Sequence, residues 1–148
     1  MVSVYYEDIQ VGQSASMEKT VTEEDVRAFG DATGDLNPLH FDEAYARTTI
    51  FRGRVAHGAL CIGFISAVVG TKLPGAGTIF LTAKTDFKAP VRIGNHVVTT
   101  CTVREVRERR EVVLDCVCTV DGKVMVTGEA LVLAPKRPKR QGLNPISP

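Results

Sequence analysis

The spacing of apolar residues along the 148-residue chain predicts one long buried helix. Between residues 57 and 73, large apolar side chains recur in an i, i+1, i+4, i+5 pattern, which is typical of one face of a helix. The opposite face of this segment is small, with Ala59, Gly63, Ser66, Ala67 and Gly70. Because the segment is apolar nearly all round, we expect it to lie inside the protein, where a sheet or an acyl chain can approach its small side closely.

Alternation of apolar and polar residues predicts strands before and after this helix. One strand candidate precedes it at 14–21, and four follow it at 78–87, 97–103, 112–120 and 124–133. Asp121-Gly122 is a strong two-residue hairpin turn between the last two strands. The order predicts an α+β fold in which a long antiparallel meander wraps around the central apolar helix and buries it.

Two further helices are predicted between the first strand and the central helix. Thr22 is a suitable N-cap with acids in the following turn, and Gly34 is a typical residue beyond a helix end. Asp42 is the predicted cap of a second, shorter helix, after which residues 48–55 form an irregular crossing. The polar residues 34–40 between the two helices form a turn, which Pro38 stiffens by keeping its predecessor out of the helical region.

Composition and charge limit the class of protein. With 44% apolar residues, the chain can bury a real core. Residues after Ala134 hold four of the 18 basic residues and no acid, so the rest of the chain has more acids than bases. This argues against nucleic-acid binding, which needs a basic face. We expect one domain over residues 1–134 and a basic, Pro-rich, disordered tail over residues 135–148.

The sequence indicates a cytoplasmic protein without a membrane partner. Residues 1–10 contain two acids and no apolar core, unlike a signal peptide. The longest apolar run, at residues 59–70, is roughly half the ~20 residues that a membrane span needs. All four cysteines fall in apolar-patterned segments, which predicts buried, reduced thiols.

Asp35 and His40 are the strongest candidates for chemistry, in the segment GDLNPLH at residues 34–40. A helix would point them to different faces, but a stiffened turn can bring both to one water. A carboxylate and an imidazole that share a water form a general acid–base pair. Asn37 between them can orient the turn or the substrate. Each residue alone is more often a cap or a structural histidine, but the whole motif favours the catalytic interpretation.

Gly58 supplies a complementary group at the start of the predicted central helix, in VAHGAL at residues 55–60. The first N–H groups of a helix lack partners and carry positive partial charge. A glycine also lets a ligand atom approach its N–H closely. An oxyanion developing on a thioester carbonyl could be stabilised there. We interpret His57 as a cap or a structural turn residue and assign it no catalytic role.

The segment GDLNPLH, Ala46 and the later His57-Gly58 resemble the MaoC-like hydratases, in particular the (R)-specific enoyl-CoA hydratases of the hotdog fold. The resemblance extends over roughly residues 5–134. It implies an antiparallel sheet wrapped around a long central helix, and a homodimer whose sheets join edge to edge. It also implies syn addition of water to trans-2-enoyl-CoA, giving (R)-3-hydroxyacyl-CoA.

The resemblance also implies residue roles. Asp35 and His40 match the catalytic pair, Gly58 the oxyanion donor, and Ser66 a small polar residue lining the site. Because one water serves both carbons from one side, we expect no metal and no cofactor. Coenzyme A is not counted as a cofactor, since it is part of the substrate. Coenzyme A phosphates need basic contacts. The candidates that flank the site in sequence, each also explicable as a solvated surface charge, are Arg52, Arg54, Lys84, Lys88 and Arg92.

Three other functions stay open at the level of sequence. The first is a hotdog thioesterase. Many such enzymes resemble one another in using a carboxylate on the central helix, and the absence of one from residues 57–73 counts against this function. Asp35 could nevertheless activate a hydrolytic water. A non-catalytic acyl-CoA-binding module would not require the Asp35 and His40 pair. A dehydratase of fatty-acid synthesis would use the same site in the opposite direction.

Overall fold

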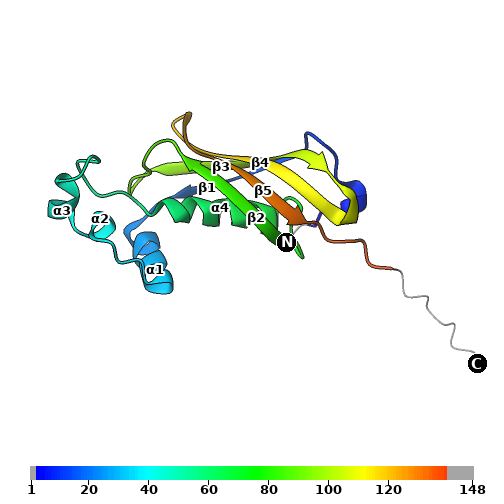
Figure 1. Ribbon diagram of the computed structural model, residues 1–148, viewed down its shortest axis with the longest axis horizontal. Helices are drawn as coiled ribbons and strands as arrows, with labels where there is room; N and C mark the ends of the chain where they lie inside the picture. Colours follow the sequence, from blue (N-terminus) through cyan, green and yellow to red (C-terminus); the bar gives the residue numbers. More distant parts are fainter. Residues whose placement is uncertain (1–2, 140–148) are drawn as a thin grey trace, which may run out of the picture.

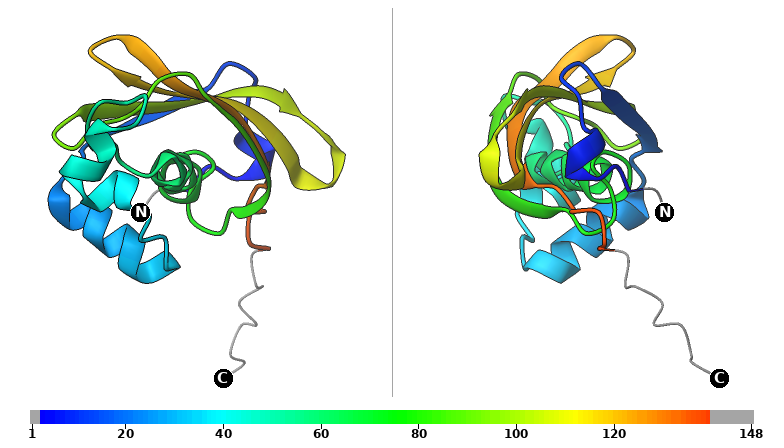
Figure 2. Two further views of the ribbon diagram at one scale, coloured as in Figure 1. Left: turned by 60° about the vertical axis from the view of Figure 1, so that its left-hand side comes forward. Right: turned by 90° about the vertical axis from the view of Figure 1, so that its right-hand side faces the viewer.

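One five-stranded antiparallel sheet curves over one long helix in the computed structural model, which describes residues 3–139. Figure 1 shows helix α4 running beneath the sheet, and the end-on view in Figure 2 shows the sheet wrapping around it. The elements in chain order are the 3₁₀ turn η1 (Tyr6–Asp8), β1 (Ser14–Thr20), α1 (Glu23–Thr33), α2 (Pro38–Phe41), α3 (Glu43–Arg47), α4 (Gly58–Thr71), β2 (Ile79–Phe87), β3 (His96–Val106), the 3₁₀ turn η2 (Glu108–Arg110), β4 (Glu111–Val120) and β5 (Lys123–Leu133).

The order of strands in the sheet is β1-β3-β4-β5-β2. The predicted meander is therefore confirmed for β3, β4 and β5 but wrong for β2, which pairs with β5 at the far edge. Pro90 lacks the N–H that a continuing ladder would need, and residues 88–95 carry the chain away from β2 to the other side of the sheet. Strand β2 consequently has one unpaired edge in the single chain.

The local signals at helix and hairpin ends are confirmed. Thr22 accepts a hydrogen bond from the Asp25 N–H, and the Asp25 carboxylate accepts one from the Thr22 N–H, which is a complete capping box. Gly34 ends α1 with φ of 80°, a conformation that glycine adopts without steric cost. Asp121 and Gly122 also have positive φ, as the tight hairpin between β4 and β5 requires.

Helix α4 is buried on one side only, so the expectation of burial all round was wrong. Its large apolar residues pack into the core under the sheet, and they are Cys61, Phe64, Ile65, Val68 and Val69. The small residues Gly63 and Ser66 face solvent on the opposite side. Five strands are enough to cover one face of the helix, and the other face stays open in the single chain.

The cysteines are free and buried, as predicted. No helix among residues 3–139 is long and apolar enough to cross a membrane.

The first part of the predicted tail is in contact with the rest of the chain. The Pro135 carbonyl accepts a hydrogen bond from the Tyr6 N–H, and Arg137 forms an ion pair with Asp8. Arg137 also lies over the ring of Tyr5. Residues 140–148, the larger part of the tail, lie outside the described residues.

Candidate active site

The loop between α1 and α2 positions Asp35 and His40. The Asp35 carboxylate accepts a hydrogen bond from the Asn37 N–H at 3.2 Å. The Asn37 side chain in turn accepts one from the Leu39 N–H at 3.0 Å and caps the one-turn helix α2. Pro38 stands at the first position of that helix, where its missing N–H costs nothing. The predicted turn is thus partly helical, and α2 presents His40 from its last turn.

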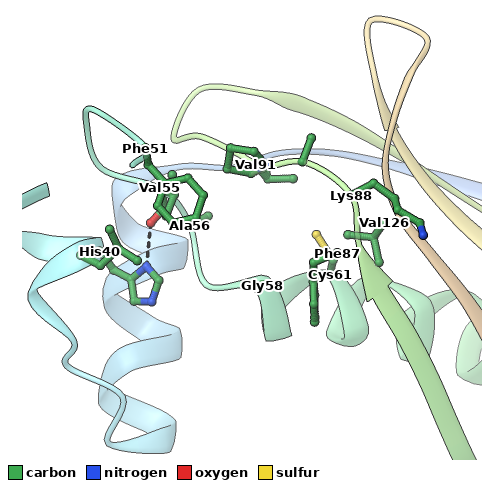
Figure 3. A pocket seen from close by; sticks show the side chains of 13 residues that line it. His40, Phe51, Val55, Ala56, Gly58, Cys61, Phe87, Lys88, Val91 and Val126 are labelled. Atoms are coloured by element: carbon green, nitrogen blue, oxygen red, sulfur yellow. Dashed lines mark hydrogen bonds between the residues drawn. The ribbon is translucent and has the colours of Figure 1, made fainter. Parts of the chain in front are cut away.

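His40 is buried and has a fixed ring orientation. Its Nδ1 donates to the Val55 carbonyl at 2.7 Å, which leaves Nε2 with a free lone pair when the ring is neutral (Figure 3). Burial is the largest influence on its pKa and lowers it from the usual value, with a smaller lowering from His57. The ring is therefore held neutral, with one nitrogen available to accept a proton.

Asp35 and His40 are brought together as predicted, and His57 joins them. One carboxylate oxygen of Asp35 and one ring nitrogen of each histidine lie within 4.8 Å of one another. These are atom types that zinc takes as ligands. The two rings stack with centroids 3.9 Å apart and planes at 33°, and each already contacts a backbone carbonyl through one nitrogen, Nδ1 of His40 and Nε2 of His57. His40 therefore has Nε2 left to share a water with the Asp35 carboxylate.

Gly58 begins α4 beside the same loop. As the first residue of the helix, it has an N–H without an intrahelical acceptor. A side chain at this position would collide with Phe87, because its Cβ would lie 2.9 Å from the ring. The glycine therefore permits the close packing of the end of β2 against the start of the helix.

A cavity of about 300 Å³ is lined by His40 and Gly58, while Asp35 and His57 lie outside its lining. Figure 3 shows it between His40, Gly58 and the end of β2, with Cys61 and Val126 further along α4 and the sheet. Its remaining lining is apolar apart from Lys88, and includes Leu39, Phe51, Val55, Ala56, Ala89, Pro90 and Val91. An apolar cavity with an imidazole and a helix N-terminus at one place can bind an acyl chain and polarise its carbonyl end.

Two of the residues predicted to contact coenzyme A have other partners. Arg54 pairs with Glu23 through two hydrogen bonds of 2.7 and 2.8 Å and donates from Nε to the His40 carbonyl. Arg92 donates to the carbonyls of Phe51 and Arg54. Both guanidinium groups hold the crossing between α3 and α4 in place.

The other predicted binding residues are dispersed. Lys88 lines the cavity, and Arg52 lines a separate polar hollow of about 360 Å³. Lys84 is exposed in the middle of β2, opposite Glu129 in the β2–β5 register. Ser66 lies on the exposed face of α4, outside the lining of the cavity.

Phe87 and the contact between His57 and Asp35 are features of the site that sequence reasoning missed. Phe87 ends a strand and carries no chemical signal. The His57 contact joins residues 22 positions apart, and the only sequence signal was the position of His57 directly before Gly58.

The chain belongs to the family with a MaoC like domain, whose family model matches residues 7–122. An (R)-specific enoyl-CoA hydratase of Rhodospirillum rubrum is 52% identical over 134 residues, which cover 90% of this chain and 93% of that protein. A 3-hydroxybutyryl-CoA dehydratase of Methylorubrum extorquens is 44% identical and covers 90% of this chain and 86% of its own. The unliganded R-hydratase PhaJ1 of Pseudomonas aeruginosa has a similar structure, with TM-score 0.86 and 37% identity over 99% of this chain and 97% of that one. The predicted family and the hotdog fold are both confirmed.

Proposed function

We propose that this protein is an (R)-specific enoyl-CoA hydratase, which adds water reversibly to trans-2-enoyl-CoA and gives (R)-3-hydroxyacyl-CoA. The observation that carries the proposal is the proximity of Asp35 to His40, which lines one apolar cavity together with Gly58, the first residue of α4. Relatives that cover most of the chain are named for this reaction or for the dehydration that reverses it.

The reaction proceeds on one face of the enoyl thioester. Asp35 and the neutral His40 hold a water, and its oxygen attacks C3 as its proton passes to the pair. The electrons of the double bond move to the thioester oxygen, and the Gly58 N–H stabilises the developing charge. The proton returns to C2 from the same pair. Since the hydroxyl and the proton come from one side, addition is syn, and no metal or redox cofactor takes part.

Lys88 is the basic residue best placed to meet the coenzyme A part of the substrate. It lines the cavity, whereas Arg54 is occupied by Glu23. We assign Arg52 the same role at longer range, because its polar hollow adjoins the crossing that carries Val55.

The protein acts as a cytoplasmic homodimer in this proposal. The unpaired edge of β2 and the exposed small face of α4 support a second copy that joins edge to edge with the first. The four free thiols fit a reducing compartment.

Loss of enoyl absorbance from crotonyl-CoA, with chiral analysis of the product, tests the proposal. We expect (R)-3-hydroxybutyryl-CoA from the wild-type protein, and a kcat lower by about two orders of magnitude or more for Asp35→Asn. The asparagine can still accept the Asn37 N–H, so the melting temperature should be unchanged.

Three outcomes would contradict the proposal. Near-normal turnover by Asp35→Asn would show that Asp35 is not part of a catalytic pair. An (S) product would show that water adds to the opposite face of the double bond. Release of free thiol in place of hydration would identify a thioesterase instead.

A further inference from the structure

We propose that His57 is a positioning residue, which holds Asp35 and His40 in register with Gly58 without contacting the substrate. This inference rests on the proposed hydratase function and deepens it, because it gives His57 a part in aligning that same site.

His57 ties the two halves of the site together. Its Nε2 donates to the backbone carbonyl of Asp35 at 2.9 Å, which requires the hydrogen to be on Nε2. It is also the N-cap residue of α4, directly before Gly58. A single side chain therefore fixes the carboxylate-bearing loop relative to the oxyanion donor, across 22 positions of sequence.

The ring also forms one wall of the His40 site. It stacks on His40 with a centroid separation of 3.9 Å, and the rings of Phe29 and Phe41 lie 4.8 and 5.7 Å from it. His57 is only 2% exposed and does not line the cavity. Its influence on the reaction must therefore pass through Asp35 and His40.

A histidine carries a cost in this slot that an apolar ring would avoid. Nδ1 of His57 is buried and has no hydrogen-bond partner within residues 3–139. A buried unpaired polar atom costs stability. Phenylalanine would fill the slot without this cost but could not donate to Asp35. Glutamine could donate but would not stack as an imidazole does.

The position of His57 also affects the charge of His40. The titratable and charged groups that face His40 are His57 at the start of α4, Asp35 in the loop and Arg54 in the crossing. Besides burial, His57 and Arg54 lower the His40 pKa, while Asp35 raises it. An amide in place of His57 removes the lowering that a protonated His57 exerts at acid pH, and should therefore raise the pKa of His40.

Two amide variants separate the hydrogen bond from simple packing. In His57→Gln the amide nitrogen can reach the place of Nε2 and donate to Asp35. In His57→Asn the shorter side chain puts its nitrogen near the place of Nδ1. With crotonyl-CoA, we expect kcat within a few-fold of wild type for Gln, and a loss of about 10- to 100-fold for Asn with little change in KM.

The pH dependence gives a readout that a purely structural role would not move. The acid limb of the kcat/KM profile should shift to higher pH in both variants. Ring ¹⁵N NMR measures the same change without turnover, since the chain has three histidines and the exposed His96 serves as the internal reference. The wild-type spectrum should also show His57 with its proton on Nε2.

The inference would be overturned if both variants lost activity equally, or if neither changed kcat and the His40 pKa. A wild-type His57 with its proton on Nδ1 would also overturn it. If the wild-type protein did not hydrate enoyl-CoA while the NMR results were as expected, the proposed function would fail and the coupling of His57 to His40 would stand.

Discussion

The charge of His40 is set by what surrounds its ring. Burial lowers its pKa, and the Val55 carbonyl opposes that effect by accepting from Nδ1. The net lowering means that the neutral ring is favoured in the folded protein at pH values where a free histidine begins to protonate. A base with a free lone pair is thus available at neutral pH, and its conjugate acid returns a proton readily.

The first prediction concerns the pH dependence of rate and stability. Because the folded pKa of His40 is lowered from 6.5, kcat/KM should hold down to a pH below 6.5 before it falls. The unfolded chain binds a proton at higher pH than the folded one, so the free energy of unfolding should decrease as pH falls below 6.5 and stop responding to His40 below its folded pKa.

A pH–rate profile and urea titrations at pH 7 and pH 5.5 check both statements. His96→Asn is the control, because His96 is an exposed surface histidine paired with Glu18 and should not affect the acid limb. An acid limb above 6.5 in the wild-type protein would contradict the assignment of His40 as the titrating group.

At the scale of elements, the loop that carries Asp35 lies directly against α1. A Cβ at Gly30 would lie 2.7 Å from Phe41 and 3.2 Å from the Asp35 carbonyl. The same carbonyl accepts the hydrogen bond from His57. Gly30 therefore allows the loop that carries Asp35 to approach α1 closely.

Gly30→Ala should lower kcat while leaving the protein folded. The extra methyl group favours the helix by up to about 1 kcal/mol but pushes the Asp35 carbonyl away. We expect a loss of about tenfold or more in kcat, since small misplacements of catalytic groups are costly. Gly70→Ala in α4 is the matched control, because nothing lies within 4 Å of its Cβ. Equal activities of the two variants would show that the loop adjusts without cost.

The pair of Arg54 and Glu23 connects α1 to the crossing, and its role can be separated from coenzyme A binding. If Arg54 braces the His40 carbonyl, then Glu23→Gln should impair kcat as Arg54→Ala does, although it leaves the arginine in place. The stability cost should not exceed about 1 kcal/mol, because the pair is partly exposed. If instead Arg54 bound a phosphate, Glu23→Gln would free it and lower KM for enoyl-CoA.

The elements whose signals are local were predictable, and those that depend on distant contacts were not. Thr22, Gly34 and Asp121-Gly122 determine their own caps and turn, so the ends of α1 and the β4–β5 hairpin followed from the sequence. The place of β2 beside β5 depends on pairing across some 45 positions, which no local pattern encodes.

The residues of the site also fall into those that local motifs predict and those that depend on distant contacts. Asp35, His40 and Gly58 lie in two short motifs, and the chemistry of those motifs placed them together. The partner of Arg54 is 31 positions away, so the sequence could not indicate that its charge was already paired. The outward direction of Ser66 depends on which side of α4 the sheet covers.

At the scale of the whole molecule, the sheet ends at β1 on one side and at β2 on the other, and the cavity lies at the β2 edge. Strand β2 leaves its outer edge unpaired and exposes Ile79, Leu81 and Phe87. Phe87 and the following Lys88 line the cavity. A hydrophobic, unpaired strand edge is a liability in a monomer, and native proteins cover such edges. A partner that covered the β2 edge would also hold the end of β2, where Phe87 packs on Gly58. Covering this edge should therefore affect the site.

Leu81→Asp should separate the proposed dimer and lower activity together. The leucine is 46% exposed in the single chain, and a dimer formed through β2 would bury a carboxylate there against the partner. Sedimentation should give twice the mass of one chain for the wild-type protein and a single-chain mass for the variant. Val11→Asp, at a residue 65% exposed outside the sheet, controls for the added charge and should stay dimeric. A wild-type monomer with full hydratase activity would show that the cavity needs no partner, whereas a fall in kcat that follows dissociation would tie catalysis to the β2 edge.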